Sequence, residues 1–215
     1  MKIKYLAVAL IALAGLGFTQ RANAILEMTY NDGSGNSSQY LLGTAIPGVQ
    51  HGGQADRDAA MTNQLLSMGL GAQTTATING DAANYSRSFN NFGSLPAATA
   101  TGAVLGTGIQ NGTTPVTVNL GTGFQYLVVA YDGPNGAAAV FNVGGLTGSV
   151  DLYRYGKPLA NGNILGSNTA QQGYFLMTGW ALLNPTGQVP DGGATVMLLG
   201  TALGALAMVR RKLKI

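Results

Sequence analysis

The chain has 215 residues, including 33 glycines, with 9% charged and 46% hydrophobic residues. This composition indicates one glycine-rich globular domain and excludes charge-expanded disordered chains. It contains no cysteine and one histidine, which excludes disulfide frameworks, zinc–cysteine sites and a multi-histidine metal site within the chain. The net charge of +3 arises at the ends, because the first 21 residues carry three cations and the last six carry four, whereas the rest carries four cations and eight anions. We therefore expect no nucleic-acid partner.

Residues 1–24 have the layout of a secretory signal peptide. Lys2 and Lys4 precede an apolar run over residues 5–18, and the segment closes on small residues at Ala22 and Ala24. The run is 14 residues long, shorter than the ~20 residues that span a bilayer. We expect signal peptidase to cleave after Ala24.

Residues 25–188 form the predicted exported domain, and one segment of it has a helical pattern. Met61 and Leu65 lie four residues apart within residues 55–68, and Asp56 or Asp58 can cap the N-terminus of this helix. A single short helix is therefore expected within the body.

The rest of the body is predicted to be β-strand. Residues 115–120 alternate apolar and polar side chains, and two apolar segments flank a five-residue turn-rich loop at 132–136, as in a hairpin. Mainly β structure, in a β-sandwich of jelly-roll type, is the expected fold. The predicted strands are 25–30, 39–42, 74–78, 85–89, 115–120, 124–131, 138–143, 149–153 and 174–183.

Catalytic patterns are sparse in the body. His51 lies in a glycine-rich loop, no Gly-x-Ser-x-Gly motif accompanies it, and Asp56 and Asp58 are interpreted as a helix start rather than an acid–base pair. The loops at Asp32 and Asp132 lack the spacing of an EF-hand calcium site. We expect no metal, no cofactor and no catalytic residue, with a secreted carbohydrate-active hydrolase as the alternative.

Aromatic residues concentrate in the second half of the body. Stacking on a sugar needs an exposed ring face, and Trp180 and Tyr155 are the candidate glycan contacts. The competing interpretation places these rings in the sandwich core. The tyrosines and the tryptophan of this region are Tyr126, Tyr131, Tyr153, Tyr155, Tyr174 and Trp180.

The C-terminal residues 189–215 fall into three parts. A short motif over 189–193 precedes a predicted transmembrane helix over 194–209 and a basic tail over 210–215. Sixteen helical residues reach about 24 Å, just short of the ~30 Å hydrocarbon core, and the cations should stay cytoplasmic. A plain tail anchor is one interpretation. The motif residues are Val189, Pro190, Asp191, Gly192 and Gly193, and the basic stop consists of Arg210, Arg211, Lys212 and Lys214.

This layout resembles the PEP-CTERM sorting signals, in the VPDSG-CTERM-like variant, with Gly192 where that variant has serine. The hairpin over 126–133 and the helix over 58–66 with Asn63 are also similar to segments of exported PEP-CTERM domains. The resemblance implies an exosortase-type membrane protease as partner, in a Gram-negative bacterium that makes exopolysaccharide. The chain would then pass through the inner membrane, with the tail as a transient anchor, and reach the cell surface or extracellular matrix.

The sequence thus predicts a non-enzymatic exported surface or matrix protein that associates with exopolysaccharide. A self-assembling matrix fibre is a third possibility, because the chain has few charges and many strands.

Overall fold

A computed structural model describes residues 25–26, 38–47, 54–107, 114–121, 123–131 and 136–186. These residues form twelve strands and one helix, α2 (Ala55–Leu66). The strands are β1 (Ile25–Leu26), β2 (Leu41–Ile46), β3 (Gln73–Ile78), β4 (Asp81–Arg87), β5 (Val104–Thr107), β6 (Val116–Gly121), β7 (Phe124–Tyr131), β8 (Ala137–Asn142), β9 (Gly148–Leu152), β10 (Tyr155–Pro158), β11 (Ile164–Ser167) and β12 (Phe175–Pro185).

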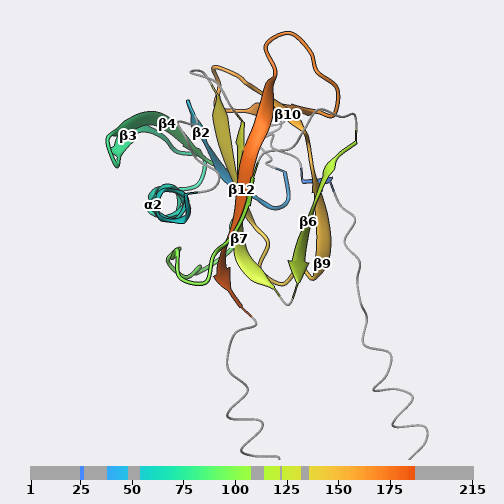
Figure 1. The fold of residues 1–215 in the computed structure, drawn as a ribbon. Helices are drawn as coiled ribbons and strands as arrows, with labels where there is room; N and C mark the ends of the chain where they lie inside the picture. Colours follow the sequence, from blue (N-terminus) through green and yellow to red (C-terminus); the bar gives the residue numbers. More distant parts are fainter. Residues whose placement is uncertain are drawn as a thin grey trace, which may run out of the picture.

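The strands form two sheets of unequal width. The larger has nine strands in the order β11-β10-β12-β7-β8-β2-β4-β3, with β5 added beside β12. The smaller has the order β1-β9-β6, and only its β1–β9 pair is parallel. Figure 1 shows β6 and β9 on one side of the larger sheet and α2 on the other. The prediction of a mainly β, sandwich-like fold with one helix is confirmed for the part of the chain described here.

The larger sheet is buried on both faces at its centre. Along β7, Leu127 and Val129 enter the core between the two sheets, which we call the inner core. Tyr126 and Val128 enter the core between this sheet and α2, which we call the outer core. The continuous apolar run in β7 is explained by this burial on both faces, because a strand with one solvent-exposed face would alternate apolar and polar side chains.

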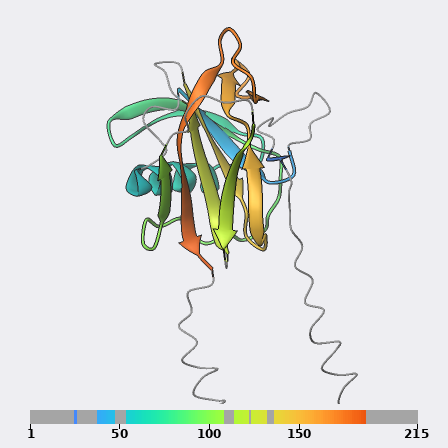
Figure 2. The same cartoon turned by 45° about the vertical axis from the view of Figure 1, so that its right-hand side comes forward.

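Helix α2 lies against β2 and β4 through Met61 and Leu65, both fully buried. Gly43 of β2 permits this close approach, because a Cβ there would lie 2.6 Å from the Ser86 carbonyl oxygen and 2.8 Å from Leu65 Cδ2. Figure 2 shows the helix beneath the β3–β4 hairpin from a second direction.

The predicted capping of α2 is wrong. The N-cap is Gln54, without a side-chain capping bond, and Asp58 is fully buried within the first turns. The helix also ends at Leu66 rather than residue 68.

Most of the predicted strands lie close to their expected bounds, including the short β3, β6 and β9. Strand β7 has its expected bounds, whereas β2 and β4 are displaced from the expected 39–42 and 85–89. Strands β5, β10 and β11 were missed, because each has four residues and contains a glycine. No helix among the described residues is long and apolar enough to cross a membrane. The expected signal peptide (1–24) and transmembrane helix (194–209) lie outside the described residues.

Candidate functional site

A polar cleft lies on the inner face of the larger sheet, at its β2–β4–β3 end. The register pairs Thr44 with Ser86, Ile46 with Asn84, and Asn84 with Thr75. Ala45 and Tyr85, paired between these rows, belong to the outer core. The cleft has a volume of about 380 Å³ and is lined by Ile46, Gln73, Thr74, Thr75, Asn84, Ser86, Leu159, Ala160 and Gly162.

The turn over 159–163, between β10 and β11, forms the second wall of this cleft. It closes on itself through the bond from the Leu159 amide to the Asn163 carbonyl, 2.9 Å. The buried Thr44 hydroxyl donates to the Gly162 carbonyl at 2.6 Å and fixes the turn to β2. Gln73 Nε2 donates to the Asn161 carbonyl at 3.2 Å and ties β3 to the same turn. The cleft is therefore held at both walls by side-chain hydrogen bonds.

Asn84 presents an oriented amide in the cleft. The Thr75 hydroxyl donates to Asn84 Oδ1 at 2.7 Å, which leaves the Nδ2 hydrogens to face an added acceptor. Asn84 and Thr75 are both exposed. No ionisable side chain is among the described residues that line the cleft, so its recognition chemistry consists of neutral donors and acceptors.

Several charged side chains elsewhere in the described residues form ion pairs or hydrogen bonds within the fold. Arg57 Nη1 pairs with Asp81 Oδ2 at 3.2 Å. Arg87 is buried, donates to the Leu42 carbonyl at 2.6 Å, and its pKa is lowered by desolvation. Arg154 Nε donates to the Thr114 carbonyl at 3.0 Å. These contacts leave a surface with few charges.

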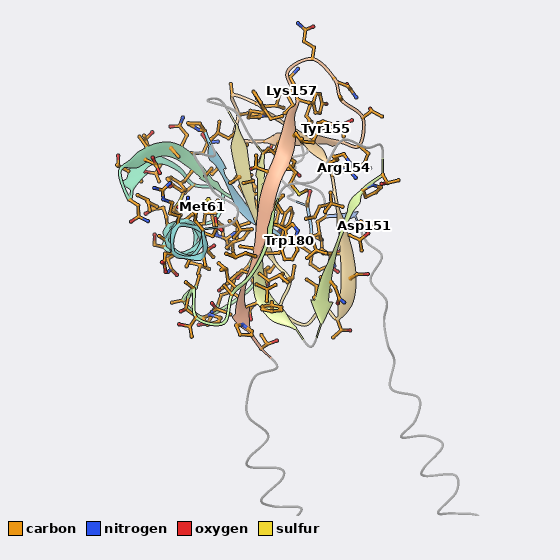
Figure 3. The ribbon with its side chains drawn as sticks, in the orientation of Figure 1. Met61, Asp151, Arg154, Tyr155, Lys157 and Trp180 are labelled. Atoms are coloured by element: carbon orange, nitrogen blue, oxygen red, sulfur yellow. The ribbon has the colours of Figure 1, made fainter. Side chains whose placement is uncertain are left out.

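The predicted glycan rings do not meet in one site. Figure 3 shows Trp180 near the middle of β12 and Tyr155 on β10. Tyr155 is only 8% exposed, so the expectation that it offers a ring face to solvent is wrong. Trp180 is partly buried against the inner core and covers Gly106, where a Cβ would lie 2.0 Å from its ring. One face of the indole is therefore already occupied by the backbone of β5.

The other candidate residues do not assemble a catalytic site within the described residues. Asp56 is exposed and Asp58 is buried, and neither lines the cleft. The described residues contain no group of three metal-ligating side chains. His51, Asp32, Asp132 and the residues of both predicted processing sites lie outside the described part.

The cleft is hard to recognise in the sequence because its residues come from three strands and a turn. The signal in the sequence is weak: Gln73 and Thr75, and likewise Asn84 and Ser86, repeat neutral polar side chains at period two. Such a repeat predicts a solvent-exposed strand face. Only the pairing of β3 with β4 shows that the polar faces of these two strands lie side by side.

The strand β12 leads from this body to the C-terminal motif. Asn184 holds its end, because its Oδ1 accepts from the Thr99 amide and its Nδ2 donates to the Ala97 carbonyl, both at 2.7 Å. A shallow hollow of about 710 Å³ lies beside this end, lined by Thr99, Thr101, Gly102, Val104, Phe124, Asn184 and Pro185. The described residues end at Thr186, two positions before residue 188.

Residues 188–213 match the VPDSG-CTERM motif, which is nearly the segment that the sequence resemblance covered. Comparisons of the chain with curated proteins and with solved structures found no match. The match covers the tail alone and does not include the β-sandwich body. The chain thus carries a PEP-CTERM-like VPDSG-CTERM sorting tail, as expected of an exosortase substrate, and this tail indicates export to the cell surface or the extracellular space.

Proposed function

We propose that this chain is a non-enzymatic surface or matrix protein whose body holds a neutral exopolysaccharide in the cleft between β3–β4 and the 159–163 turn. The observation that carries the proposal is the lining of this cleft: amides and hydroxyls from Gln73, Thr75, Asn84 and Ser86, without an ionisable group among the described lining residues. Sugar hydroxyls both donate and accept hydrogen bonds, and this set offers both functions.

The lack of charge in the cleft favours binding over hydrolysis. Glycoside hydrolysis needs two carboxyl groups placed across the bond that is cut. The described aspartates are instead engaged in the Arg57–Asp81 pair, buried in α2, or placed on other faces. The cleft volume of about 380 Å³ falls within the ~300–1,000 Å³ range of small-ligand sites, enough for a short segment of a polymer.

The sorting tail supplies the route to the polymer. We propose that an exosortase cuts near Pro190 and Asp191 in the inner membrane of a Gram-negative cell and releases the body to the exopolysaccharide. In this proposal the predicted helix over residues 194–209 acts as a transient anchor, and the basic residues Arg210 to Lys214 hold its cytoplasmic end. Double replacement of Pro190 and Asp191 by alanine should leave full-length protein in the membrane fraction, and mass spectrometry of matrix protein ending at Ile215 would contradict the cut.

Binding is tested with the exported protein and three polymers: the exopolysaccharide of the producing cells, a neutral glucan and a uronate polymer. Asn84→Ala and Ser86→Ala should each weaken retention on the neutral polymers several-fold, whereas Gln39→Ala, an exposed amide outside the cleft, should not. Retention that is unchanged in both cleft variants, or that follows only the uronate polymer, would contradict the proposal.

A further inference from the structure

Among the described residues, strand β3 is an edge of the larger sheet. It lies at the end of the strand order, and β4 is its one strand partner in this part of the chain. The turn at Asn79 and Gly80 has positive φ at both residues, 53° and 91°, so Ile78 and Asp81 form the hydrogen-bonded pair that closes the hairpin. Alternation then directs the backbone groups of Thr75 and Thr77 away from β4. Among the described residues, neither has a backbone partner on that side.

This edge lacks the features that usually protect one. Strand β3 has six residues, Gln-Thr-Thr-Ala-Thr-Ile, without charge or proline, and its register with β4 is unbroken. Natural edge strands are normally blocked by lysine, proline, a bulge or a very short length. Asp81, the nearest charge in the hairpin, is neutralised by Arg57 at 3.2 Å. A second strand could therefore approach without meeting an unpaired charge on this hairpin.

The sequence of β3 is complementary to itself in one antiparallel register. If Thr75 lies on a two-fold axis, Thr75 faces its copy as a hydrogen-bonded pair and Gln73 faces Thr77 of the second copy. Each of these residues directs its side chain to the same sheet face, so the pairing preserves the inner and outer faces of both copies. Threonine pairs across strands are favourable contacts.

We propose that two copies of this chain pair isologously through β3, joining their larger sheets and placing their polar clefts side by side. The two-fold axis runs perpendicular to the sheet, so both clefts open on the same face. Asn84, Thr75 and their two symmetry copies then form one row across four strands, about 14 Å long at the ~4.8 Å strand spacing. The dimer itself is independent of the proposed function, whereas its joined groove for one polymer strand rests on that function.

The pairing is tested first by a single cysteine, since the chain has none. Thr75→Cys places its Cα about 5.5 Å from its copy in a hydrogen-bonded pair, within disulfide range. A mild oxidant should convert this variant of the exported protein to a covalent dimer at least about tenfold faster than Ser94→Cys, an exposed loop control. Equal rates for the two variants would overturn the proposed axis.

The second test removes the edge hydrogen bond without altering the cleft. Thr77→Pro deletes an amide that points outward, and Thr77 does not line the cleft. Light scattering should give twice the monomer mass for the parent protein, and Thr77→Pro should raise the dissociation constant at least about tenfold, because symmetry removes the bond twice. Thr77→Lys, with its fold checked by circular dichroism, should act in the same direction.

The outcomes separate the dimer from polysaccharide binding. Asn84→Ala should weaken polymer binding several-fold and keep the dimer, whereas Thr77→Pro should weaken the dimer and keep single-cleft binding. A parent protein that stays monomeric up to millimolar concentration would overturn the proposal. Open-ended polymers, or a dimer abolished by Leu105→Lys on the exposed β5 edge and unaffected by Thr77→Pro, would do the same.

Discussion

The centre and the β3–β4 end of the larger sheet share one ladder of strands but face different surroundings. At the centre, β7 and β8 are buried on both faces, by the smaller sheet on one side and by the outer core on the other. At the β3–β4 end, the outer face still packs on α2, whereas the inner face carries the exposed Thr75 and Asn84. Among the described residues, the three-stranded sheet covers only the centre of the nine-stranded one, and the part that it leaves exposed forms the polar cleft.

The largest effect is expected at the doubly buried centre. Phe141→Ala should lower the free energy of unfolding by about 3–5 kcal/mol, because Phe141 is fully buried in the inner core and its removal leaves a cavity. Urea unfolding of the exported protein measures the change. A loss below about 1 kcal/mol would mean that the smaller sheet does not seal this core.

The contact between α2 and the sheet should be the next most sensitive. Gly43→Ala should cost about 1–3 kcal/mol, because the added methyl meets the Ser86 carbonyl, which cannot move like a side chain. The same denaturation experiment checks the effect. Gly69→Ala is a suitable control, since a Cβ there has nothing within 4 Å.

A smaller loss is expected where α2 holds the 88–103 segment. Asn63 accepts from the Ala98 amide at 2.7 Å and donates to the Ala98 carbonyl at 3.0 Å. Asn63→Ala should destabilise the fold by about 1–2 kcal/mol and speed hydrogen exchange at residue 98. Unchanged exchange at that amide would contradict this role of Asn63.

Alkaline pH should also act on the buried faces. Burial raises the pKa of Tyr126 to about 12 from 10.0 and also raises the pKa of Tyr85 and Tyr131. Because the unfolded chain loses these protons first, stability should be constant below about pH 10 and fall as the pH rises toward 12. Denaturation midpoints at pH 8 to 11 test this, and a midpoint that rises above pH 10 would contradict it.

The smallest effect on stability is expected at the cleft. Thr75→Ala should change the free energy of unfolding by no more than about 0.5 kcal/mol, because the side chain is exposed and its one bond is to the exposed Asn84. A loss above about 1 kcal/mol would show that the β3–β4 end contributes to stability as buried parts of the sheet do, and would contradict the expected difference between the two regions.

Much of the fold follows from patterns that the sequence displays. Three local patterns each predict the element that they form. They are the apolar run of β7, the alternation of apolar and polar residues in β6, and the spacing of Met61 and Leu65 in α2. The failures have a physical reason. Asp58 is a residue type that often caps helices, but tertiary packing buries it here. The four-residue strands β5 and β10 pair with β12, and β11 pairs with β10, so these strands depend on partners that are distant in the sequence.

The candidate site was much less predictable than the fold. An aromatic ring can stack on a sugar only when one of its faces is exposed. The sequence around Tyr155 and Trp180 has no pattern from which the burial of these two rings could be predicted. The cleft depends on the register between β3 and β4 and on a turn whose Asn161 lies 88 residues after Gln73 in the chain. The tail was predictable because its signal is read in sequence order.

Few residues of the sequence separate β12 from the sorting motif. Strand β12 ends at Pro185 and the motif begins at Val189, so three residues separate them and span at most ~11 Å when fully extended. A protease acting at the motif must therefore work within about one strand-length of a folded surface held by Asn184. We therefore expect the space between the folded body and the motif to limit any cut there: lengthening this connection should speed processing, and a bulky group fixed beside residues 97–99 should slow it.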